Sequence, residues 1–79
     1  MLRIKEGIDL KELEKFGYEE SDEGICEPYI IYIKYIAPYT KIEIYPEDRA
    51  ILKSIDIYSR VVEEKDIEDL IKADMVEKV

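Results

Sequence analysis

The segment that most constrains the fold is the run YIIYIKYI at residues 29–36. Successive side chains of a strand point to opposite faces of a sheet, and apolar side chains occupy both faces of this run. Isoleucine and tyrosine also favour a pleated, half-buried surface. The run therefore predicts a central strand that is covered on at least one face of its sheet.

Shorter strand patterns surround this run. Residues 41–45 alternate between two isoleucines and the side chains between them, and a second alternating segment covers residues 51–58 after a proline-containing turn. Together with residues 29–36, these segments predict an antiparallel meander. Residues 2–4 predict a short first strand. Residues 18–28 contain several turn-forming residues and predict a loop or the tip of a hairpin.

Residues 9–16 predict an amphipathic helix. Asp9 and Glu12 have the spacing of a capping box, in which each side chain accepts a hydrogen bond at the start of a helix. The apolar side chains recur at helical spacing and form one narrow stripe: Leu10, Leu13 and Phe16. Gly17 can adopt the left-handed conformation that ends many helices.

A second helical segment is expected after Val62, with Asp66 as its N-cap. Its apolar stripe consists of Ile67, Leu70 and Ile71. Residues 75–79 either prolong this helix or form a final strand that pairs with residues 2–4, and we favour the strand.

These elements predict an α+β fold in one domain covering residues 1–79, because a chain of this length has room for one hydrophobic core. Each helix has an apolar stripe that must be buried against another element. We therefore expect a small antiparallel sheet in the order β-α-β-β-β-α, with or without a short C-terminal strand. Both helices are expected on one face of that sheet.

The composition argues against several kinds of catalytic and metal site. The chain has no histidine and a single cysteine, Cys26, so Ser-His triads and structural zinc sites are ruled out. Its three glycines lie too far apart for a phosphate-binding loop. The acidic residues after Gly17 do not have the spacing of a calcium loop. We therefore expect no enzymatic activity, no cofactor and no metal, and an enzyme that uses carboxylates is the weakest alternative.

The net charge of −8 disfavours direct binding to nucleic acid and to anionic membranes, whereas it suits a basic protein partner. The longest apolar run is far shorter than the roughly 20 residues that span a bilayer. A single cysteine forms no intramolecular disulfide, and its acidic neighbour Glu27 disfavours the reactive thiolate. Since no signal peptide is visible either, we expect a cytoplasmic protein in which Cys26 is a packing residue.

Two acidic patches and a set of tyrosines are the candidate partner-binding residues. The patches are Glu19, Glu20, Asp22 and Glu23, and Glu63, Glu64, Glu68 and Asp69. Alternation places the tyrosines opposite the main isoleucine rows, where exposed tyrosines suit a binding surface: Tyr32, Tyr45 and Tyr58. The acidic segment either steers a basic partner through its summed charge or is simply a solvated surface.

Two stretches resemble the ends of short proteins that phages and mobile elements of Gram-positive bacteria encode. They are IDLKELEKFGY at residues 8–18 and DLIKADMVEKV at residues 69–79. In those proteins glycine often stands at the position of Asp74, which leaves open whether the second helix ends sharply there. The resemblance supplies no catalytic residues, and it implies a role in phage biology, where small acidic proteins often block host defence enzymes.

The leading hypothesis is a small binding protein that docks on a basic protein. In its specific form the protein is a phage-encoded inhibitor of a bacterial defence effector, such as an anti-CRISPR, that mimics the charge of a nucleic acid. The alternative is a structural or regulatory module that forms a homodimer through a sheet edge and has no inhibitory role.

Overall fold

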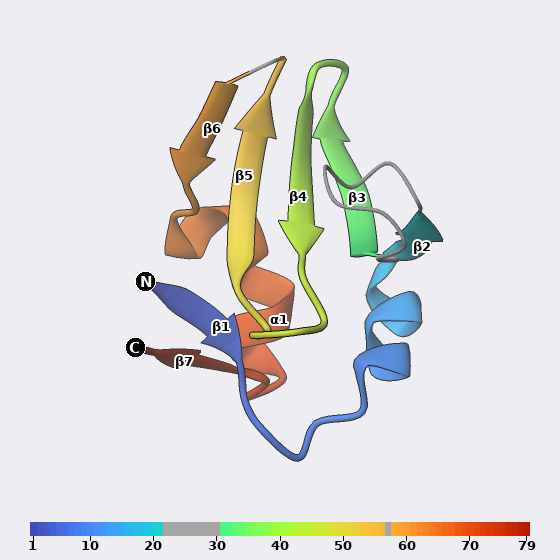
Figure 1. Ribbon diagram of the computed structural model, residues 1–79, viewed down its shortest axis with the longest axis vertical. Helices are drawn as coiled ribbons and strands as arrows, with labels where there is room; N and C mark the ends of the chain where they lie inside the picture. Colours follow the sequence, from blue (N-terminus) through green and yellow to red (C-terminus); the bar gives the residue numbers. More distant parts are fainter. Residues whose placement is uncertain (22–30, 57) are drawn as a thin grey trace.

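The computed structural model describes residues 1–21, 31–56 and 58–79, and its largest element is a five-stranded antiparallel sheet (Figure 1). In spatial order the strands are β2 (Glu19–Ser21), β3 (Ile31–Ala37), β4 (Thr40–Ile44), β5 (Ile51–Ile55) and β6 (Tyr58–Val61). Each strand pairs with its neighbour in the chain, which confirms the predicted meander through β3, β4 and β5.

A second, two-stranded sheet joins the two ends of the chain (Figure 1). It consists of β1 (Leu2–Ile4) and β7 (Val76–Lys78), which run antiparallel with Leu2 opposite Lys78. An ion pair of 2.7 Å between Arg3 and Glu77 links the same two strands. The final segment is therefore a strand that pairs with the first one, which confirms the alternative that we favoured over a prolonged helix.

The first helical segment is the 3-10 helix η1 (Leu10–Phe16). The side chain of its N-cap, Asp9, accepts a hydrogen bond of 3.0 Å from the backbone N–H of Lys11. Gly17 ends the helix with a φ of 90°, in the left-handed region that glycine adopts at little cost. Both ends of this helix thus lie where the sequence predicted them.

The second helical segment consists of the 3-10 helix η2 (Glu64–Ile67), followed directly by α1 (Glu68–Lys72). The N-cap is Glu63, and the prediction that Asp66 is the N-cap is wrong. Asp66 instead lies three residues further along, where its carboxylate accepts a hydrogen bond of 2.9 Å from the backbone N–H of Glu63. The two residues form a capping box, a pattern in which either carboxylate could have been read as the cap.

Two further predictions differ from the structure. The segment expected to be one strand over residues 51–58 turns back at Asp56, which has a φ of 55°, and β6 then pairs with β5. Residues 18–28 were expected to form a loop or the tip of a hairpin, and Glu19–Ser21 of that segment forms the edge strand β2, which makes an antiparallel hairpin with β3. The remainder of that expected loop, and Ile57, lie outside the described residues.

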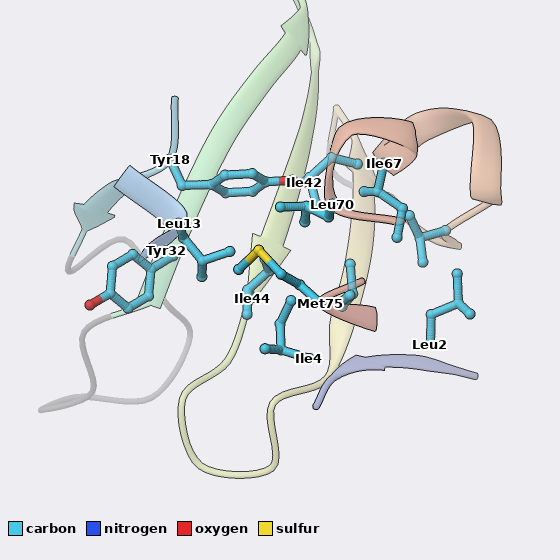
Figure 2. Packing of buried hydrophobic residues seen from close by; sticks show 12 residues of the cluster. Leu2, Ile4, Leu13, Tyr18, Tyr32, Ile42, Ile44, Ile67, Leu70 and Met75 are labelled. Carbon is cyan, nitrogen blue, oxygen red and sulfur yellow. The ribbon is translucent and has the colours of Figure 1, made fainter. Parts of the chain in front are cut away.

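One core holds the helices to the sheet. Tyr32, Ile42, Ile44 and Ile51 of the five-stranded sheet are buried together with Leu13 of η1, Ile67 of η2 and Leu70 of α1 (Figure 2). Both helical segments therefore lie on the same face of the sheet, as predicted. Ile71 departs from its predicted stripe, because 37% of its surface remains exposed.

Candidate partner-binding surface

The carboxylates of the last 17 residues, 63–79, are almost all compensated by ion pairs. The pairs are Glu63 with Lys65 (3.3 Å), Glu64 with Lys78 (3.3 Å), Asp66 with Lys53 (3.0 Å), Asp69 with Lys34 (3.1 Å), Asp74 with Lys5 (2.7 Å) and Glu77 with Arg3 (2.7 Å). In this segment only Glu68 makes no ion pair with a described residue. The second predicted acidic patch is therefore largely neutralised within the molecule.

Two lysines of the sheet explain part of this compensation. Lys34 in β3 and Lys53 in β5 lie on the face that the helices cover, since both are paired with the buried Ile42 of β4. Each ammonium meets an aspartate of the second helical segment. The signal in the sequence was a lysine within an apolar strand run, which requires a carboxylate partner if it is half-buried.

Lys34 also lies over the ring of Tyr18, with its ammonium 5.5 Å from the ring centroid. Tyr18 is buried, and this burial raises the pKa of its hydroxyl, to which the negative charge of Asp69 adds. Asp69 thus connects α1 to Lys34 of the sheet, next to the buried Tyr18. This contact holds its carboxylate against the sheet, although the sequence placed Asp69 in a partner-binding patch.

The opposite situation holds where η1 meets β2. Asp9, Glu14, Glu19 and Glu20 are exposed there, and no described lysine or arginine forms an ion pair with any of them. We call these four residues the acidic corner. Within the same stretch, Lys15 forms a 2.7 Å ion pair with Glu12, so it compensates a carboxylate outside the corner.

Tyr32 organises part of the acidic corner. Its hydroxyl donates a hydrogen bond of 3.2 Å to the carboxylate of Glu20. Burial raises the pKa of this hydroxyl, and the hydrogen bond to Glu20 together with the negative charges of Glu20, Glu14 and Asp9 raises it further. The carboxylates of Glu20, Glu14 and Asp9 therefore all act on one phenol, which residue spacing in the sequence could not reveal.

The prediction that Tyr32 lies on an exposed face is wrong, because only 7% of its surface is accessible. Tyr32 lies opposite Ile44 in the β3–β4 ladder, on the face that the helices cover. Figure 2 shows its ring at the border of the core, with the hydroxyl pointing away from the centre. The aromatic ring thus contributes to packing and the hydroxyl to the acidic corner.

The other two candidate tyrosines lie elsewhere. Tyr45 is half-buried, and its hydroxyl donates a hydrogen bond of 3.3 Å to Glu43, a carboxylate that is itself buried. Tyr58 is exposed in β6, where the guanidinium of Arg60 lies 5.6 Å from its ring centroid. The three tyrosines therefore do not form one surface.

Of the first predicted acidic patch, Glu19 and Glu20 belong to the acidic corner, whereas Asp22 and Glu23 lie outside the described residues, as does Cys26. In the described part of the chain, no group of three or more side chains could hold a metal ion. Nor does that part contain a helix with the length and apolar character needed to cross a bilayer.

Comparison with known proteins gives no further guidance: no family model, no curated protein and no solved structure matches the chain.

Proposed function

We propose that the protein is a binding module that docks on a basic surface of another protein through the acidic corner. The observation that carries this proposal is the uneven pairing of carboxylates. After Val62, every aspartate and glutamate except Glu68 is engaged in an ion pair. By contrast, Asp9, Glu14, Glu19 and Glu20 are exposed, and none of them makes an ion pair with a described residue. Glu19 and Glu20 were candidate binding residues from the sequence, and neither makes an ion pair with a described residue. Their charge is therefore available to a partner.

The carboxylates of β2 are also held in place by the fold. Glu19 and Glu20 lie in a strand whose backbone pairs with β3, and the hydroxyl of Tyr32 holds the Glu20 carboxylate. A partner that binds a positioned carboxylate loses less side-chain entropy on association. Because the whole chain carries a net charge of −8, its field also attracts a basic partner before contact.

In the narrower form of this proposal, the partner is a protein whose basic groove normally holds nucleic acid, such as a bacterial defence effector of the CRISPR type. Support for this form comes from the net charge, which suits phosphate mimicry, and from the resemblance of the chain ends to short phage-encoded proteins. In this form the chain acts as an inhibitor, because it occupies the groove in place of nucleic acid.

The test compares two variants that lose the same formal charge. The first, Glu14→Gln/Glu19→Gln/Glu20→Gln, neutralises the acidic corner, and the new amide at position 20 still offers an oxygen acceptor to Tyr32. The second, Glu63→Gln/Glu64→Gln/Glu68→Gln, is the matched control. Proteins captured from bacterial lysate on the immobilised parent are purified, and their association rates with all three forms are measured at low and high salt.

We expect the corner variant to associate about tenfold more slowly than the parent at low salt, because steering depends on local charge. The control should associate at nearly the parental rate. For the narrower form, a short DNA duplex should compete with the parent for the captured protein. Equal rates for the two variants would refute the acidic corner as the docking surface, and binding unaffected by DNA would refute the mimicry.

A further inference from the structure

The strands β2 and β6 form the two edges of the five-stranded sheet (Figure 1). These two edges differ in charge. At one edge β2 carries Glu19 and Glu20, so two copies that met there would bring four carboxylates together. At the other edge β6 has the sequence YSRV, without a carboxylate, and all four of its residues are exposed. Since an edge strand offers unpaired backbone groups to another strand, β6 is the edge at which a second copy meets less repulsion.

A groove of about 470 Å³ lies beside this edge. Its apolar lining comes from Met1, Leu2, Val61 and Val62, and Val61 is 80% exposed. The polar residues of the lining largely cancel in charge, because Glu63 pairs with Lys65 and Glu64 pairs with Lys78, each at 3.3 Å. Two copies that each carry a charge of −8 repel each other. The neutral groove adds to β6 a neighbouring surface where this repulsion is weaker.

The strand β6 is also complementary to itself. Tyr58 and Arg60 share one face of the sheet, since their partners in β5 are Ile55 and Lys53, and Ser59 and Val61 share the other. If two antiparallel β6 strands pair with Ser59 opposite Ser59, Tyr58 of each copy lies opposite Arg60 of the other. That arrangement repeats the contact of 5.6 Å between Arg60 and Tyr58 within one chain. A register centred on Arg60 would place two guanidinium groups opposite each other.

From these observations we propose that a second copy of the chain pairs with β6 in antiparallel orientation, about a two-fold axis at Ser59. The two five-stranded sheets then form one continuous sheet. The proposal is independent of the acidic corner, which lies at the opposite edge of the sheet and stays exposed in the dimer. Because a four-residue strand gives a small interface, we expect a dissociation constant on the order of 10–100 μM.

The first test is sedimentation velocity from micromolar to millimolar protein. The parent is expected to shift from monomer to dimer over this range. Val61→Lys should remain monomeric, because lysine on an edge strand opposes strand pairing. The matched control is Val79→Lys, which changes another valine that is 70% exposed but does not line the groove, and it should dimerise like the parent. A monomeric parent at every concentration, or equal dimerisation of the two variants, would overturn the proposal.

The second test probes the register by disulfide crosslinking in a Cys26→Ser background. Residues directly opposite in antiparallel strands have Cα atoms about 4.5–5.5 Å apart, which a disulfide can bridge. The Ser59→Cys variant is therefore expected to form a covalent dimer under mild oxidation. Ser21→Cys places a cysteine in the other edge strand, β2, and should remain largely monomeric. Crosslinking of Ser21→Cys as fast as that of Ser59→Cys would contradict pairing through β6.

Discussion

At the scale of single residues, the ion pair between Lys53 and Asp66 is the most buried of those described. Both side chains are 12% exposed, and the ammonium lies 3.0 Å from the carboxylate. Burial alone would raise the pKa of Asp66, but the backbone N–H of Glu63 and the charge of Lys53 outweigh it and hold that pKa below its ordinary value. The pair joins β5 to η2, so its loss should affect the whole fold.

Asp66→Asn tests this contact because asparagine can still accept the hydrogen bond from Glu63 while Lys53 loses its counter-charge. Near neutral pH we expect the free energy of unfolding to fall by about 2–4 kcal/mol. A depressed pKa stabilises the fold above the unfolded-state value of about 3.9, and this contribution is lost as the pH falls through the lower folded-state value. The difference between parent and variant should therefore narrow in acid, as measured by urea unfolding at several pH values.

Glu12→Gln is the control, since it removes an exposed ion pair with Lys15 and should change stability little. The double variant Lys53→Met/Asp66→Asn should recover part of the loss, because no charge then remains buried without a partner. A constant difference between parent and Asp66→Asn across the acid range would show that the charge of Asp66 does not contribute.

At the scale of elements, α1 ends sharply although its end has no glycine. Asp74 adopts a φ of 58°, and the backbone N–H of Met75 donates to the carbonyl of Leu70 at 3.1 Å. The left-handed conformation costs an ordinary residue roughly 1–2 kcal/mol, and aspartate somewhat less. The exposed carboxylate of Asp74 pairs with Lys5, a contact of the kind that contributes little.

We therefore expect Asp74→Gly to raise the free energy of unfolding by about 0.5–1 kcal/mol. Gly17→Ala is the reverse experiment. The added Cβ would meet only the side chain of Lys34, at 3.5 Å, which is an ordinary van der Waals contact. The loss of stability should therefore come from the left-handed backbone conformation and not from a steric clash. That variant should lose about 1 kcal/mol. Urea unfolding of both proteins measures the effect, and a destabilised Asp74→Gly would mean that the carboxylate matters more than the backbone.

At the scale of the whole molecule, unpaired negative charge repels itself and opposes the folded state. Added salt screens this repulsion, since the Debye length is about 10 Å at 0.1 M ionic strength. We expect the melting temperature to rise by about 2–4 °C between low and physiological salt, equivalent to roughly 0.5 kcal/mol for a domain of this size. Differential scanning calorimetry measures this rise.

The triple glutamine variant of the acidic corner should show a smaller rise with salt than the variant at Glu63, Glu64 and Glu68. The corner carboxylates make no ion pair with a described residue, whereas Glu63 and Glu64 are already paired. Equal salt dependence of the two variants would indicate that the repulsion is distributed over the whole surface.

The elements with local signals could be predicted from residue order alone. The run 29–36, apolar on both faces, and the alternation in residues 41–45 predicted the two central strands, and Asp9 and Gly17 marked the ends of η1. For residues 75–79 the sequence allowed a prolonged helix or a strand, and the favoured strand is the one that pairs with β1. Local signals suffice here because a pleat or a cap depends on residues a few positions apart.

Other features depend on residues far apart in the chain and follow from how the elements pack together. The turn at Asp56 has a positive φ without the glycine that would have indicated it in the sequence. Residues 19–21 form the strand β2 because their backbone pairs with β3. Tyr32 was buried by its place in the ladder. Above all, the charge of Glu64 is compensated by an ion pair with Lys78, whereas Glu20 makes no ion pair with a described residue. Ion pairing depends on the distance to the nearest cation in the folded chain, and residue order does not specify that distance.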